Sequence, residues 1–120
     1  MKKFAICLLF LLTAIVAPAA NADLKEANAA SIRGDYETAF KEYELLAKQG
    51  NAEAQFFLGL MYAMGQGVLQ DYKMAHMYFN ISAANGGDDG GKARDVIADK
   101  MTAQQIADAQ QMAYEWMAKH

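Results

Sequence analysis

After the first 22 residues, the apolar positions of this chain recur at helical spacing. In segment 35–50, for example, Ala39, Tyr43 and Leu46 follow one another at intervals of three or four residues. That interval places side chains on one face of an α-helix, whereas strands alternate apolar and polar positions. The only proline is Pro18, and no long alternating run of β-branched residues occurs. The pattern therefore predicts an all-α protein.

Capping residues and glycines divide this part of the chain into six expected helices. They are expected at about 24–33, 35–50, 51–64, 71–86, 92–100 and 102–120. Gly59 is expected to let a neighbouring helix approach closely. The run Gly87-Asp88-Asp89-Gly90-Gly91 is expected to be a flexible turn, followed by a short helix with Ala93, Val96 and Ile97 facing inward. Thr102 and Gln105 form a T-x-x-Q capping box, which predicts the start of a terminal capping helix.

The middle of the chain also repeats itself with a fixed period. Asp35 and Asp71 are 36 positions apart, and the same interval separates five further pairs. Those pairs are Tyr36 and Tyr72, Ala39 and Ala75, Tyr43 and Phe79, Ala47 and Ala83, and Gly50 and Gly86. A period of this length is typical of arrays of helix pairs, in which each unit buries its apolar face against its neighbours.

One stretch of the chain resembles a complete Sel1-like repeat, a relative of the tetratricopeptide repeat with a longer loop inside the helix pair. The matching positions are Ala52-Glu53-Ala54-Gln55, Leu58-Gly59, Tyr62, Gly65-Gln66-Gly67-Val68, Asp71-Tyr72, Ala75, Ala83-Ala84 and Gly86. The resemblance implies an all-α, right-handed superhelical stack of antiparallel helix pairs with a C-terminal capping helix. It also implies a non-catalytic adaptor role.

The expected organisation has four parts. They are a signal peptide at 1–22, a degenerate helix pair at 23–50, the Sel1-like repeat at 51–86 and capping helices at 87–120. Two departures from the family pattern matter. With one complete repeat, a long concave groove is not expected. Some exported members of the family are rich in cysteine, form a disulfide in each repeat and have been linked to β-lactam binding. This chain has no cysteine after residue 22, so that activity is not carried over.

The first 22 residues have the pattern of a secretory signal peptide. Lys2 and Lys3 precede an apolar run over 4–16, and residues 20–22 form an A-x-A-type cleavage site. The run is shorter than the about 20 apolar residues that a permanent membrane anchor needs. We therefore expect cleavage after Ala22 and no stable membrane insertion afterwards. A retained N-terminal anchor is the alternative.

Charge and cysteine content narrow the class of partner. Cleavage would remove two of the 11 basic residues, leaving nine against 14 acidic residues and a net charge of −5. This balance argues against nucleic acid or an anionic membrane surface as the main partner. The only cysteine, Cys7, would leave as well, so the domain must rely on helix packing. We expect a protein of the Gram-negative periplasm with a partner in the envelope. Secretion to the medium is the alternative.

The third expected helix carries the candidate partner-binding residues. In tetratricopeptide-like stacks the first helix of each pair lines the concave side, and the resemblance assigns that side to Glu53, Phe56, Leu60, Ala63 and Met64. Phe56 and Leu60 are apolar where a solvated helix would be polar, which is typical of partner sites. Glu53 would set the polarity of a shallow peptide-binding groove, with Asn28 and Gln55 at its border. Alternatively, the first helix or the C-terminal cap covers these residues and makes them core.

Metal sites and catalysis find little support in the sequence. The methionine pairs are Met61 with Met64, and Met74 with Met77 beside His76, and neither pair belongs to a denser copper-binding tract. Asp88 and Asp89 lack the spaced oxygen ligands of a calcium loop. No catalytic residue, metal or cofactor is therefore expected. Two other functions remain open: a small-ligand binder or weak hydrolase acting on cell-wall fragments, and self-association into a homodimer.

Overall fold

The computed structural model describes residues 23–120, and within that range every regular element is an α-helix. The signal peptide expected at 1–22 lies outside the described residues. The helices are α2 (Leu24–Ile32), α3 (Tyr36–Lys48), α4 (Ala52–Met64), α5 (Tyr72–Ala84), α6 (Asp88–Ala98) and α7 (Ala103–Lys119). None of these helices is long and apolar enough to cross a membrane.

Side chains cap the helices where the sequence predicts their starts. The carboxylates of Asp35 and Asp71 and the amide oxygen of Asn51 accept hydrogen bonds from backbone N–H groups in the first turns of α3, α5 and α4. Thr102 and Gln105 form the predicted capping box at the start of α7, with both reciprocal hydrogen bonds present. These caps fix the helix boundaries locally, before any tertiary packing is considered.

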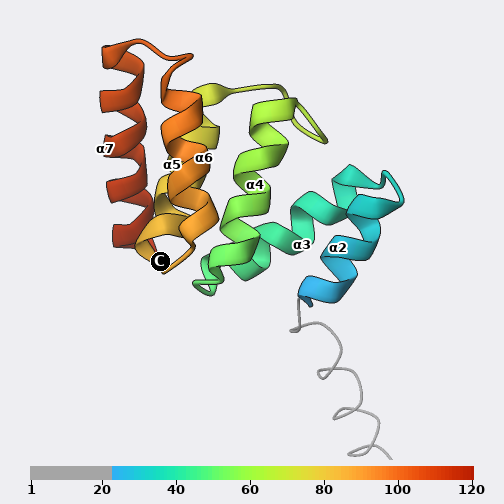
Figure 1. Ribbon diagram of the computed structural model, residues 1–120. Coiled ribbons are helices and arrows are strands. Elements are labelled where there is room, and N and C mark those ends of the chain that lie inside the picture. The colour runs from blue at the N-terminus through green and yellow to red at the C-terminus, as the bar shows by residue number, and fades with distance from the viewer. Residues whose placement is uncertain (1–22) are drawn as a thin grey trace, which may run out of the picture.

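The helices pack as successive antiparallel pairs, which confirms the predicted α/α stack. Helix α2 packs on α3, α3 on α4, and α4 on α5 (Figure 1). Helix α5 also contacts both α6 and α7, while α6 lies against α4. Figure 1 shows α4 and α6 running in the same direction, with α5 returning between their ends. Helices α4 and α6, the first helices of two consecutive pairs, are therefore neighbours on one side of the stack.

Two groups of buried side chains hold the stack together. The larger one joins α2, α3, α4, α5 and α7, with Tyr43, Leu58 and Ile81 as its largest fully buried apolar members. The smaller one contains Ala75, Phe79 and Ile97, and joins α5 to α6. Burial of this apolar surface is the main favourable contribution to folding of an array without cross-links.

Residues 88–91 correct the sequence analysis, because they form the first turn of α6 and not a flexible turn. Gly90 is buried, and a Cβ atom there would come within 2.6 Å of the Ser82 side chain. The glycine is therefore a packing residue that brings α6 onto α5. Val96 was also expected to face inward, but 66% of its surface is exposed. Ile97, which was also expected to face inward, does lie in the core at 6% exposure.

Candidate functional site

A fully buried glutamine fixes the position of α4. The Gln55 side-chain amide donates to the Ala47 carbonyl at the end of α3, at 2.9 Å, and its oxygen accepts from the Asn85 amide at the end of α5, also at 2.9 Å. From the sequence, Gln55 was expected at the border of the binding face. It lies instead inside the stack, where buried polar groups require partners.

Ser82 connects the start of α4 to α5 and α6. Its hydroxyl donates to the Ala52 carbonyl at 2.7 Å, and Gly90 of α6 packs against the same side chain. Ser82 is itself fully buried. This arrangement holds the first turns of α4 and α6 side by side with α5 behind them. A groove forms between the two helices, and α4 and α6 are its walls.

Aromatic rings line the α4 wall near its start. The Phe56 ring lies 5.8 Å from the ring of Phe79 on α5 and 5.6 Å from that of Phe57, measured between centroids. Phe57 stacks on Tyr43 at 5.1 Å, so this row continues into the α3 core. The Tyr43 hydroxyl donates to Asn28 of α2. Asn28 was expected at the border of the binding face, but it supports the core instead.

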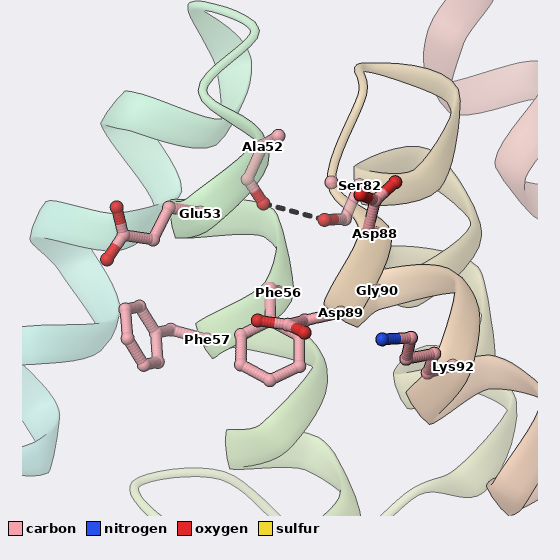
Figure 2. Close-up of a pocket in the computed structure, with 10 residues that line it drawn as sticks. Ala52, Glu53, Phe56, Phe57, Ser82, Asp88, Asp89, Gly90 and Lys92 are labelled. Carbon is pink, nitrogen blue, oxygen red and sulfur yellow. Dashed lines mark hydrogen bonds between the residues drawn. The ribbon is translucent and has the colours of Figure 1, made fainter.

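The first pocket of the groove is acidic and partly aromatic. It has a volume of about 540 Å³ and lies where α4 and α6 begin. Figure 2 shows side chains of α4 on one side and of α6 on the other. The lining residues are Ala52, Glu53, Phe56, Phe57, Ser82, Gly87, Asp88, Asp89, Gly90 and Lys92. Three carboxylates and one ammonium group leave two net negative charges around the phenyl rings.

The second pocket continues along the same two helices and is mainly apolar. Its volume is about 280 Å³. The lining residues are Leu60, Ala63, Tyr72, Phe79, Ala93, Val96, Ile97 and Lys100. Phe79 lies on its floor and contacts Phe56 in the first pocket, so the two pockets are neighbours along one groove. Lys100 is the charged residue at this end.

Comparison with known proteins identifies the helix pair formed by α4 and α5. Residues 52–87, which include α4, α5 and the residue before α6, match the family model of the Sel1 repeat. The chain carries a Sel1 repeat. A similar solved structure is that of a protective antigen present in uropathogenic Escherichia coli strains, which displays an SLR fold. The likeness has a TM-score of 0.72 at 29% sequence identity and covers 78% of this chain. This chain spans about a fifth of that antigen's length, since 21% of it is covered.

The Sel1 repeat places four of the five predicted binding residues in the groove. Glu53 and Phe56 line the acidic pocket, while Leu60 and Ala63 line the apolar one. Met64 is 55% exposed and lines neither pocket.

The cover over these residues comes from α6, one of the capping helices expected at 87–120, and from α5. Phe56 and Leu60 are half-buried because Phe79 of α5 and Ile97 of α6 pack beside them. No residue of α2 or of α7 belongs to the cluster of buried side chains against which they pack. Each of the two side chains therefore packs partly against the core and exposes its remaining surface to the groove.

Sequence reasoning missed the second wall of the groove. Asp88 and Asp89 were assigned to a turn, although both lie on α6 and line the acidic pocket together with Lys92. A signal was available, because two carboxylates directly after Gly87 are typical of the first turn of a helix. The four nearby glycines outweighed it.

The shifted ionisable groups of the Sel1 stack lie in its core rather than in the groove. Burial raises the pKa of Tyr78 to about 12, with smaller contributions from Tyr62 and Glu44. Burial, and then the nearby Arg94 guanidinium, lower the pKa of His76. Neither Tyr78 nor His76 lines the two pockets. Over residues 23–120, no cluster of three or more His, Cys, Asp or Glu side chains could hold a metal ion.

Proposed function

We propose that this protein is a non-catalytic interaction module that binds a segment of another protein in the groove between α4 and α6. Sel1 repeats are generally protein–protein interaction modules and typically non-catalytic scaffolds. The observation that carries the proposal is the pair of neighbouring pockets, which share a wall formed by the half-exposed Phe56 and Leu60.

The composition of the groove favours a peptide as its occupant. Its walls combine aromatic and aliphatic side chains with exposed charges at the edges: Glu53, Asp88 and Lys92 at one end, and Lys100 at the other. An apolar centre with a polar rim is typical of protein interfaces. Two pockets in a row suit two side chains of one segment, whereas a small ligand would use a single enclosed pocket.

We further propose that the protein acts in the bacterial envelope. The support is the pattern of the first 22 residues, in which a basic start, a short apolar run and an A-x-A-type site follow one another. N-terminal sequencing of the protein from fractionated cells tests this proposal. A periplasmic form that begins at Asp23 is expected. An unprocessed N-terminus or a cytoplasmic protein would contradict export.

Site-specific cross-linking in cells tests the groove. A photo-reactive amino acid is placed in the full chain at Val96 in the groove or at Glu53 on its rim. Matched controls carry it at Ile32 and Leu69, which are 87% and 91% exposed and line neither pocket. All four side chains reach solvent, so the cross-linker itself does not disturb the core.

Mass spectrometry then identifies what each position captures. We expect one recurrent protein at Val96 and Glu53 that is absent at Ile32 and Leu69. The same proteins captured at all four positions would show that the groove is not a distinct surface. Capture of a second copy of this chain alone would favour self-association and sink the proposal of a separate partner.

A further inference from the structure

We infer that the partner segment is extended and carries a lysine or arginine about three residues away from a large apolar residue. The basic side chain lies in the acidic pocket and the apolar one in the neighbouring pocket. This inference rests on the proposed function, because it names the chemistry of the segment that the groove binds. It comes from the charges, the spacing and the width of the groove.

Charge complementarity selects a basic side chain at the first pocket. Glu53, Asp88 and Asp89 are exposed around it, and Lys92 balances only one of them. Within residues 23–120 none of these four groups takes part in an ion pair. A cation that enters therefore gains attraction without having to displace an existing partner.

The aromatic lining adds a preference for a long basic side chain. Phe56 and Phe57 lie beside the carboxylates in the same pocket (Figure 2). The methylene stem of lysine or arginine packs on apolar surface while its charged head stays near the carboxylates. A guanidinium group also interacts favourably with the face of an aromatic ring.

The geometry of the helices sets the spacing between the two side chains. On α4, Glu53 in the acidic pocket and Leu60 in the apolar pocket are seven residues apart, and on α6 the same interval separates Asp89 and Val96. Seven residues correspond to about 10 Å at about 1.5 Å of rise per residue. An extended chain in the polyproline II conformation covers that length in about three residues, at about 3.1 Å each.

The width of the groove favours an extended segment over a helix. Helices α4 and α6 contact each other directly as well as through α5. A bound helix with side chains has a diameter of about 10 Å or more and needs walls that stand further apart. In the extended polyproline II conformation three residues make one turn, so side chains three positions apart point to the same side and both can enter the pockets.

Peptide display on the protein purified from cells that express the full chain tests this inference. A library of random peptides of 12 residues is panned against the wild type. The selected peptides are then measured by fluorescence anisotropy against the wild type and a triple variant, Glu53→Gln with Asp88→Asn and Asp89→Asn. A matched control, Glu26→Gln with Glu37→Gln and Glu115→Gln, loses the same charge outside both pockets. Circular dichroism checks that both variants are folded.

We expect enriched peptides in which a lysine or arginine and a large apolar residue are three positions apart. Their affinity should fall about fivefold or more in the triple variant, but little in the control. It should also weaken as ionic strength rises from about 0.05 to about 0.5 M. An apolar consensus without a basic residue, bound equally by all three proteins, would overturn this inference and leave the proposed function standing. Absence of any enriched peptide would overturn both.

Discussion

The ring of Phe79 on α5 lies directly against Gly59 on α4. A Cβ atom at Gly59 would come within 2.4 Å of two ring carbons, and Phe79 itself is only 2% exposed. The absence of a side chain at this point lets the two helices of the Sel1 repeat approach closely. It also sets the floor of the apolar pocket, which Phe79 lines. Here packing within the repeat and the shape of the groove depend on the same contact.

Gly59→Ala is therefore expected to destabilise the protein. Alanine is the better helix former, but the added methyl group must displace a buried ring, and overpacking of this kind costs about 1–3 kcal/mol. Urea unfolding measures the difference. Gly91→Ala on α6 is the matched control, because a Cβ there meets its nearest side chain at an ordinary 3.6 Å. That control should gain about 0.5–1 kcal/mol. Equal stability of the two variants would contradict the close contact.

Gln55→Ala should also destabilise the stack, because it removes the hydrogen bonds that join α4 to the ends of α3 and α5. The Ala47 carbonyl and the Asn85 amide would each lose a partner at 2.9 Å. The Ala47 carbonyl keeps its bond from the Gly50 N–H, and the Asn85 amide keeps its bond to the Ile81 carbonyl. The loss of two hydrogen bonds should therefore cost about 1–3 kcal/mol, which is measurable as a lower urea midpoint.

Gln111→Ala on the exposed face of α7 is a suitable control, since its partner Glu115 remains in water. Similar small effects in both variants would show that the Gln55 bonds are dispensable.

The sequence was sufficient to predict the all-α fold because local signals agreed with one another. Caps such as Asp35, Asp71 and Thr102 lie where the helical apolar spacing begins, and the structure contains all three as N-caps. Gly59 was correctly expected to admit a neighbouring helix. These features act within a few residues of the chain, or within one repeat, so they can be read without knowledge of distant contacts.

The missed features depend on contacts between distant residues. Gly90 looks like a turn residue until Ser82 of α5 is seen to occupy the space that its side chain would fill. Gln55 looks like an exposed border residue until the Ala47 carbonyl and Asn85 are placed beside it. The α4 wall of the groove was predictable from one helix and its family resemblance. The α6 wall was not, because it requires the packing of α6 on α5.

Acidification should destabilise the protein through His76. This side chain is 2% exposed, and its Nδ1 atom has no hydrogen-bond partner in the described part of the chain. Burial and the facing Arg94 guanidinium on α6 lower its pKa, while Asp95 on the same helix opposes the shift. The unfolded chain then takes up a proton at a higher pH than the folded protein does. Stability is therefore full above about pH 6.5 and falls as the pH decreases below that value.

The comparison of wild type with His76→Leu checks this effect. Melting temperatures are measured between about pH 5 and about pH 8, the range in which histidine titrates. The wild type should lose stability towards pH 5, while the leucine variant should change much less over the same range. His120 is exposed and present in both proteins, so it does not account for a difference between them. Parallel curves for the two proteins would show that His76 is not the responsible group.

Val96→Glu is expected to weaken partner binding without lowering stability. Substitution of Phe56 and Leu60 would lower both. The two wall residues are half-buried against Phe79 and Ile97, so replacing both by alanine should cost about 2–4 kcal/mol as well as affinity. Val96 is 66% exposed on the rim of the apolar pocket, and glutamate is tolerated on an exposed helix surface. We expect partner capture to fall while the melting temperature stays nearly unchanged. Ile32→Glu, at an 87% exposed position outside the groove, should leave both unchanged. Undiminished capture by the Val96→Glu protein would place the interaction elsewhere on the stack.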